Sequence, residues 1–322
     1  MNVAETIELA SYVSAGLCIG LGAIGAAVGE GYTAGFANRA ISQKESKSGD
    51  IMKTMLVGQA VAESAAIFAL VIAILLIFMD FPGQSLLGAA SLLGAGLCMG
   101  FGAIGSGAGS GFPGGQACLG IARQPAVAGK LTTNMLIGSA VCQTPAIFSM
   151  VVALMLMFMS FDHLPLAPTW AALIGAGVST GLAAIGSGFG GGLAAGSSCA
   201  GIARTPHTVG PVTTTMLVGQ AVSQTPAIFG LLVSFILMFK AFPESATLAA
   251  AMAPLGAGLC MGFGGIGPGI GNGYTAEKAV TWIARNSDAS GVLTRTMLVG
   301  QAVSQSTAIY AMVVSLVLIF VI

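Results

Sequence analysis

The chain has 322 residues, of which 55% are hydrophobic and only 7% are charged, and its formal net charge is zero. A soluble domain carries about a quarter charged residues, so this composition indicates an integral membrane protein with little mass outside the bilayer. No basic run points to nucleic acid as a partner. The acidic start, with Glu5 and Glu8, differs from the basic start of a cleaved signal peptide.

Two motifs recur with the same spacing and divide the chain into four units. Met-Leu-(Val/Ile)-Gly begins at residues 55, 135, 216 and 297, with spacings of 80, 81 and 81. A second motif, small-(Gly/Ala)-Ile-Gly, ends at Gly25, Gly105, Gly186 and Gly267 with the same spacings. We therefore expect hairpin 1 at 1–82, hairpin 2 at 83–165, hairpin 3 at 166–244 and hairpin 4 at 245–322.

Each unit holds a glycine-rich apolar half, a polar loop and a second apolar half rich in Leu, Val, Ile and Met. In chain order, the expected helices cover residues 6–42, 51–79, 87–123, 131–160, 168–203, 212–241, 248–285 and 292–321. A bilayer is crossed by about 20 helical residues, so each segment can span and several should project. The sequence predicts an all-α integral membrane fold of four tandem two-helix transmembrane hairpins, as part of a ring.

Glycine and proline distinguish the two helices of a unit. Because missing side chains let helix backbones approach closely, the glycine-rich first helices should form an inner layer and the second helices an outer layer that touches lipid. Pro145 and Pro226 lie inside two second helices. Since proline removes a helix hydrogen bond, those two helices should bend differently from the others.

Charge predicts the orientation. Ten of the eleven Lys and Arg residues lie in or beside the loops within hairpins, and Lys240 is the exception. The linkers between hairpins carry acidic residues and turn-forming prolines instead. These are Asp80, Pro82, Asp162, Pro165, Pro168, Pro243 and Glu244. The positive-inside rule then places the hairpin loops in the cytoplasm and both termini on the opposite side of the cell membrane.

One carboxylate interrupts the second helix of the first unit. Met55–Phe78 is a run of 24 residues whose single formal charge is Glu63. A carboxylate near the middle of a membrane helix costs at least a few kcal/mol, so Glu63 is predicted to hold a proton or an ion rather than merely to pack. The aligned residues are Gln143, Gln224 and Gln305. An amide can hydrogen-bond at the same depth but cannot balance a cation, so we predict one exchangeable carboxylate per four hairpins.

Glu30, on the first helix, is the second candidate ligand. Its counterparts are Ser110, Gly191 and Asn272, and it lies about as far from the hairpin loop as Glu63 does. The two carboxylates are therefore expected to meet at one depth. They cannot both be charged within a few Å unless a cation lies between them, so a sodium ion with one shared proton is the expected occupant. The alternative is that Glu30 is only a charge near a helix end.

These residues resemble the c subunit, or proteolipid, of rotary F-type and N-type ATP synthases and ATPases. The segment from Gly58 to Ser64, Gly-Gln-Ala-Val-Ala-Glu-Ser, is similar to the ion-carrying segment of sodium-type c subunits, and Ala122–Pro125 to their cytoplasmic loop. The resemblance covers essentially the whole chain. It implies a rotor ring in the lipid bilayer that turns against a stator a subunit, with central-stalk subunits docked on the loops. It implies a non-catalytic subunit without a cofactor, whose transported ion is Na⁺ or H⁺.

The resemblance also implies how an ion site is composed. In the family, one hairpin supplies the inner-helix ligand and the carboxylate, here Glu30 and Glu63, and its neighbour supplies a carbonyl, a hydroxyl and a tyrosine. The candidate second halves are Val61/Ser64/Phe68, Val141/Thr144/Phe148, Val222/Thr225/Phe229 and Val303/Ser306/Tyr310. Because only hairpin 4 keeps the tyrosine, we predict that the complete sodium site forms across the junction of two chains.

The number of carboxylates bears on the direction of coupling. In a ring of this chain alone, few ions cross per turn, and each carries about 2.3 kcal/mol per 100 mV. The sequence therefore favours an ATP-driven pump over a synthase, although a ring mixed with single-hairpin c subunits would carry more ions. Two further alternatives are a structural proteolipid ring and a passive ion channel. A channel would need a polar stripe along a helix face, and only one depth is polar here.

Overall fold

The computed structural model describes residues 2–81, 85–245 and 247–322, and these are almost entirely helical. The helices are α1 (Val3–Gln43), α2 (Ser48–Phe78), α3 (Leu87–Arg123), α4 (Ala128–Phe158), α5 (Leu166–Arg204), α6 (Val209–Ser223), α7 (Thr225–Phe239), α8 (Leu248–Ile283) and α9 (Ser290–Phe320). Within the described ranges, eight helical segments are long and apolar enough to cross a membrane. The predicted all-α membrane fold is confirmed. Pro82, predicted to mark the first linker, lies outside the described residues.

Local signals set where the helices begin and turn. Asn2 caps α1, because its side-chain oxygen accepts from the Glu5 N–H at 2.8 Å and the Glu5 carboxylate accepts from the Asn2 N–H at 2.9 Å. In hairpins 2 and 3, Pro125 and Pro206 begin short 3-10 turns within the loops. Proline fits a first helical turn, where its missing N–H is not needed. The sequence thus places sharp turns at the hairpin loops.

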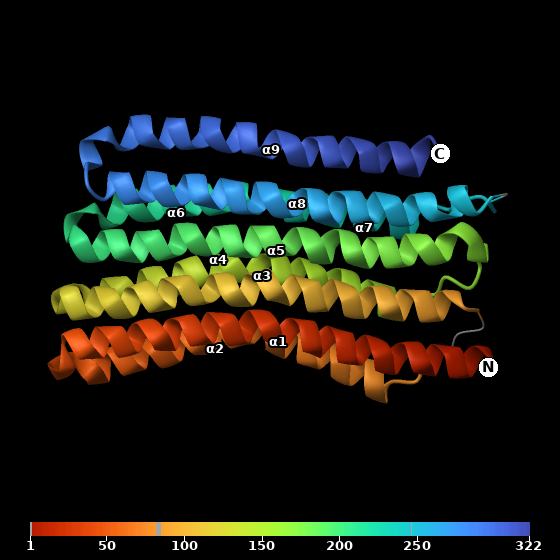
Figure 1. Ribbon diagram of the computed structural model, residues 1–322, viewed down its shortest axis with the longest axis horizontal. Coiled ribbons are helices and arrows are strands. Elements are labelled where there is room, and N and C mark those ends of the chain that lie inside the picture. The colour runs from red at the N-terminus through yellow and green to blue at the C-terminus, as the bar shows by residue number, and fades with distance from the viewer. Residues whose placement is uncertain (1, 82–84, 246) are drawn as a thin grey trace.

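The hairpins stand side by side with all their loops at one end. Figure 1 shows the loops at the left end and both termini at the right. The glycine-rich helices α1, α3, α5 and α8 form one continuous layer, in which each contacts the next along most of its length. Helices α2, α4 and α6–α7 lie behind this layer, and α9 packs on α8. The order of the layer follows the order of the chain, so α1 lies at one edge and α8 with α9 at the other.

Glycine permits the close packing of the inner layer. A Cβ placed at Gly105 would lie 2.5 Å from the Cα of Ile185, a separation that a real side chain could not adopt. The corresponding Cβ at Gly186 would lie 2.7 Å from the Cα of Ile266. Backbones therefore touch directly, as expected where packing rather than water drives helix association.

Only one of the two prolines lies beside an interruption of its helix. The helix expected at 212–241 is divided at Gln224 into α6 and α7, two residues before Pro226, whereas α4 runs through Pro145. In both places the next backbone N–H is bound by a serine of the inner helix. Ala146 N–H donates to Ser106 at 3.1 Å and Ala227 N–H donates to Ser187 at 3.2 Å. The two prolines therefore share a local environment, although only the second lies beside an interruption of its helix.

The polar seams between hairpins

The outer and inner polar residues of one hairpin meet at a single depth. Gln143 donates to the Ser110 hydroxyl at 2.6 Å, and Asn272 donates to the Gln305 side-chain oxygen at 2.8 Å. Glu30 of α1 and Glu63 of α2 hold the equivalent positions in hairpin 1, and the Gln59 side chain, four residues before Glu63, lies 3.4 Å from the Glu30 carbonyl oxygen. The structure therefore places the two residues that the sequence singled out at one depth on neighbouring helices.

A second row of amides lies four residues nearer the loops. Gln220 donates to the carbonyl of Gly191 at 3.0 Å, Gln301 donates to that of Asn272 at 3.0 Å, and Gln59 lies 3.4 Å from the carbonyl oxygen of Glu30. Gln220 and Gln301 also donate to the preceding hairpin, at Gly138 (2.9 Å) and Gly219 (3.1 Å). Sequence reasoning missed this row. Its signal was the spacing of four that separates Gln59 from Glu63, which places both on one face of a helix.

The contacts that side chains make with valine carbonyls across the seams run in one direction. Gln143 of hairpin 2 donates to the Val61 carbonyl of hairpin 1 at 2.8 Å, and Gln224 of hairpin 3 donates to the Val141 carbonyl of hairpin 2 at 2.8 Å. At the third seam, Asn272 of hairpin 4 donates to the Val222 carbonyl at 3.4 Å. In each case the later hairpin supplies the polar side chain and the earlier one supplies the carbonyl.

The direction of these contacts bears on the four residue groups that the sequence offered as the neighbour's contribution to the ion site. The carbonyls of Val61, Val141 and Val222 are engaged by the polar residues of hairpins 2, 3 and 4. Val61, which the sequence offered as a possible ligand, thus presents its carbonyl to hairpin 2, and Ser64 donates to that same carbonyl at 2.7 Å. The remaining carbonyl is that of Val303, which accepts the hydroxyl of Ser306 in its own helix at 2.7 Å.

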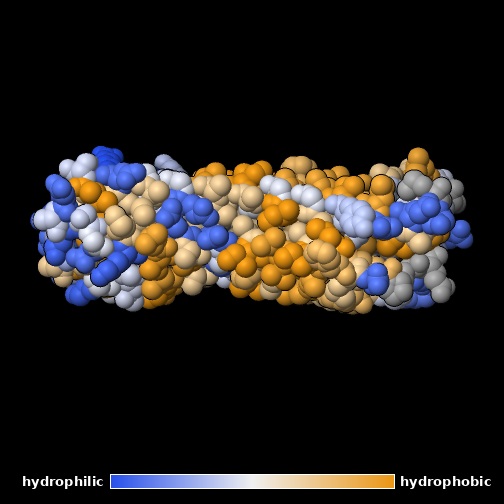
Figure 2. Space-filling view, turned by 90° about the horizontal axis from the view of Figure 1, so that it is seen from below, coloured by the Kyte–Doolittle hydropathy of each residue, from blue (hydrophilic) through white to orange (hydrophobic). Residues whose placement is uncertain are grey.

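The two edges of the molecule differ from its interior at this depth. Val303 is 69% exposed and Tyr310 is 65% exposed, whereas their internal counterparts are partly covered. At the opposite edge, Glu63 is exposed and Glu30 is partly exposed. Figure 2 looks at the edge formed by α1 and α2 and shows a hydrophilic patch within a largely hydrophobic surface. The carboxylates and the Val303 carbonyl therefore lie on opposite free edges of one chain.

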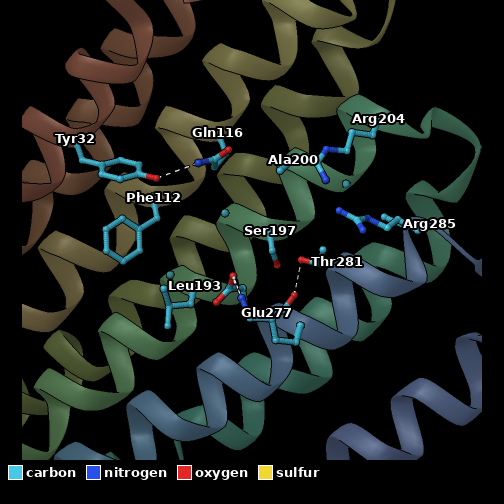
Figure 3. Close-up of a pocket in the computed structure, with 15 residues that line it drawn as sticks. Tyr32, Phe112, Gln116, Leu193, Ser197, Ala200, Arg204, Glu277, Thr281 and Arg285 are labelled. Carbon is cyan, nitrogen blue, oxygen red and sulfur yellow. Dashed lines mark hydrogen bonds and ion pairs between the residues drawn. The ribbon is translucent and has the colours of Figure 1, made fainter. Parts of the chain in front are cut away.

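A separate cavity of about 430 Å³ lies on the inner layer near the loops. It is lined by α1, α3, α5 and α8 together with Arg285, which follows α8, and Figure 3 shows Arg204 and Arg285 at one end of it. Among its lining residues, the Glu277 carboxylate pairs with Lys278 at 2.9 Å, and the Arg285 guanidinium lies 4.6 Å from the ring centroid of Trp282, which does not line the cavity. Neither Glu30 nor Glu63 lines this cavity, so the hollow is distinct from the carboxylate pair.

Comparison with known proteins identifies the architecture. The family model for the C subunit of ATP synthase matches four times, at residues 13–76, 93–156, 174–237 and 255–318. The chain belongs to this family. Its four matches cover more than half of the chain, one per hairpin, and each includes one position of the Glu63/Gln143/Gln224/Gln305 set.

Individual relatives cover one hairpin or several. An ATP synthase c subunit of Natranaerobius thermophilus is 47% identical over 77 residues, 24% of this chain and 88% of the relative. One from Petrotoga mobilis is 49% identical over 67 residues, 21% of this chain and 70% of the relative. The K subunit of an A-type ATP synthase from Methanocaldococcus jannaschii is 31% identical over 199 residues, 62% of this chain and 83% of the relative. Membership in the c-subunit family places the chain in a membrane and gives it a rotor-ring role in a rotary ATPase.

Proposed function

We propose that this member of the c-subunit family carries Na⁺ on Glu63 at the junction between successive copies in the ring. The observation that carries the proposal is the common direction of the three seams, in which each hairpin offers a polar side chain to a valine carbonyl of the hairpin before it. Among the described residues, no other hairpin offers such a carbonyl to Glu30 and Glu63 of hairpin 1. Hairpin 4 of another copy, whose Val303 carbonyl meets no other hairpin in the part of the chain that the structure describes, would fill that place.

The proposed site joins five groups from two copies. Glu30 and Glu63 come from one copy, and the carbonyl of Val303, the hydroxyl of Ser306 and the supporting ring of Tyr310 come from the other. Carboxylate, carbonyl and hydroxyl oxygens are the ligands that hard cations prefer. One cation and one proton would balance the two carboxylates, because a pair of close negative charges is unfavourable in a membrane.

Sodium is favoured over the proton as cargo by the number of oxygens that converge. A proton carrier needs only Glu63, whereas this edge also carries Glu30, and the facing edge offers a carbonyl and a hydroxyl that already lie 2.7 Å apart. Bound H⁺ is the alternative occupant.

The partners follow from the family. The ring would move past a stator a subunit that exchanges the ion at each site, and the basic hairpin loops, on the cytoplasmic side, would dock the central stalk. The seams of hairpins 2–4 carry glutamine in place of the carboxylate, so a ring of this chain alone moves one ion per four hairpins. Such a low ion count favours ATP-driven pumping over ATP synthesis.

Labelling with dicyclohexylcarbodiimide in intact rings tests the cargo. Glu63 should react, and added Na⁺ should protect it at constant pH. Protection by protons alone, with no effect of Na⁺, would make the chain a proton carrier. A carboxylate that neither cation protects would instead favour a structural ring or a channel.

Reconstitution of the complete complex with a ring of this chain alone tests the direction. ATP hydrolysis should build a steep Na⁺ gradient, and ordinary gradients should not drive ATP synthesis. Net ATP synthesis at ordinary gradients would contradict the pump, and finding single-hairpin c subunits in the purified ring would show that the ring is mixed.

A further inference from the structure

Three glycines set the spacing of the inner helices at the depth of the polar seams. Each presses on the backbone of the preceding inner helix so closely that a Cβ would lie within 3.0 Å of a backbone nitrogen, which real side chains do not tolerate. The distances are 2.6 Å from Gly107 to the nitrogen of Ala26, 2.5 Å from Gly188 to that of Ser106, and 2.6 Å from Gly269 to that of Ser187. At the three internal seams, only glycine fits.

The exposed edge of α1 carries glycines at the positions where α3 packs on its neighbour, with one exception. A Cβ at Gly16, Gly20 or Gly31 would meet nothing within 4 Å. Their counterparts in α3, namely Gly96, Gly100 and Gly111, all pack on α1. The exposed edge of α1 therefore has the shape that lets α3 pack against α1. In a ring, the inner helix that would pack on this edge of α1 is α8 of a second copy. At the fourth position, however, the counterpart of Gly107 is Ala27, which is exposed.

The residue opposite Ala27 also differs. The positions of Ala26, Ser106 and Ser187 are held in α8 by Pro268. Its backbone nitrogen carries a ring carbon where the others carry a hydrogen. A methyl group on one side and a proline nitrogen on the other cannot adopt the separation found at the internal seams. Carbon contacts are most favourable at about 3.5–4.0 Å, so the helices must stand roughly 1 Å farther apart here.

The wider separation between the two inner helices lies at the seam whose inner-helix residue, Glu30, is the largest of the four counterparts. Ala27 lies three residues before Glu30, which places both on one side of α1. In the internal seams the position of Glu30 is held by Ser110, Gly191 or Asn272, and Ser110 and Asn272 are fully buried. An internal seam thus has room for a small or neutral side chain at this depth. The seam that holds a glutamate is also the seam that lacks the clamping glycine.

We propose that Ala27 is a spacer that keeps the junction between copies open, so that Glu30 and a cation fit beside Glu63. This inference rests on the proposed sodium site. Ala27 does not contact the ion. It is a positioning residue that acts through the distance between α1 and α8 of the next copy. The three internal seams, closed by glycine, hold their glutamines without room for an ion.

The test uses three variants of the full chain, purified as rings. Ala27→Gly removes the methyl group from the α1 side of the junction and leaves Pro268 in place, Ala27→Ser keeps a side chain of similar size, and Gly107→Ala adds a methyl at an internal seam. The measurements are the Na⁺ concentration that half-protects Glu63 from dicyclohexylcarbodiimide at fixed pH, and the temperature at which the ring dissociates. A27G should raise the half-protecting concentration roughly tenfold, because a displaced charged ligand costs about 1.5 kcal/mol. A27S should retain the wild-type concentration.

The control separates a spacer from ordinary packing. G107A should lower the dissociation temperature, because its methyl overlaps the backbone of α1, whereas A27G should not lower it. An unchanged half-protecting concentration in A27G would overturn the proposal. So would an A27G ring that fails to assemble, because a closer seam should tighten the inner layer. If Na⁺ fails to protect wild-type Glu63, the proposed sodium site itself is wrong, which is a different result from either.

Discussion

The interior seams and the free edges of this chain are built from the same repeat, yet their polar residues are arranged differently. At each interior seam, an amide donates to a backbone carbonyl or to the polar partner beside it, and the inner helices touch through glycine. At the edges, a carboxylate pair on one side and the Val303 carbonyl on the other face outward. The comparison teaches that the edge departs from the interior at several neighbouring positions: Glu63 replaces a glutamine, Glu30 replaces a small or neutral residue, and Ala27 replaces a glycine.

The largest expected effect comes from making the edge resemble the interior. Glu63→Gln should abolish ATP-driven Na⁺ uptake in proteoliposomes while leaving the ring assembled. The introduced amide would donate to the next copy's Val303 carbonyl just as Gln143 donates to that of Val61. Na⁺ uptake that persists in E63Q would show that another group carries the ion.

Removing an amide that donates to the neighbouring hairpin should lower the stability of the ring and leave ion transport unchanged. Gln224→Ala leaves the carbonyl of Val141 without its 2.8 Å donor. A buried group without its partner costs about 1–3 kcal/mol, so the ring should dissociate at a lower temperature. The control is Thr6→Ala, because Thr6 lies at the start of α1 and its hydroxyl donates to the Asn2 carbonyl beside it. A Q224A ring as heat-resistant as T6A would mean that the amide contributes nothing to the seam.

The tyrosine that marks the edge should tune affinity. Tyr310→Phe converts it to the residue present at the internal seams and should raise the half-protecting Na⁺ concentration at Glu63 by about three- to tenfold, since one hydrogen bond is lost. The converse change, Phe148→Tyr, should have no such effect, because hairpin 2 does not face Glu63. A shift with F148Y, or none with Y310F, would place the site at an internal seam.

The smallest effect concerns Lys240, the one basic residue that the sequence placed away from the loops. Its ammonium donates to the carbonyl of Ile319 near the end of α9 and lies 4.6 Å from the Phe320 ring centroid. Lys240→Met should therefore loosen the C-terminal turn of α9 by about 1 kcal/mol. Faster amide exchange confined to the last residues of α9 would support this role, and unchanged exchange would remove it.

Periodicity made the architecture predictable from sequence. Two motifs repeated at a constant interval fix four hairpins, and apolar length fixes eight spans, so little else is needed for the fold. The depth of Glu30 beside Glu63 was predictable too, because both lie about equally far from one loop. The direction of the seams was not. Which valine carbonyl each polar side chain meets depends on how neighbouring hairpins pack, and each repeat offers the same candidates on both sides. Nothing in the Gln-Thr-Pro sequence that Pro145 and Pro226 share explains why only the second lies beside an interruption of its helix.

The most direct test of the account is a high-resolution map of the isolated ring in saturating Na⁺. We expect one ion density per chain, between the Glu30 and Glu63 carboxylates of one copy and the Val303 carbonyl of the next, and none at the three glutamine seams. An ion at a glutamine seam, or Glu63 facing hairpin 2 of its own chain while Tyr310 lies elsewhere, would contradict it.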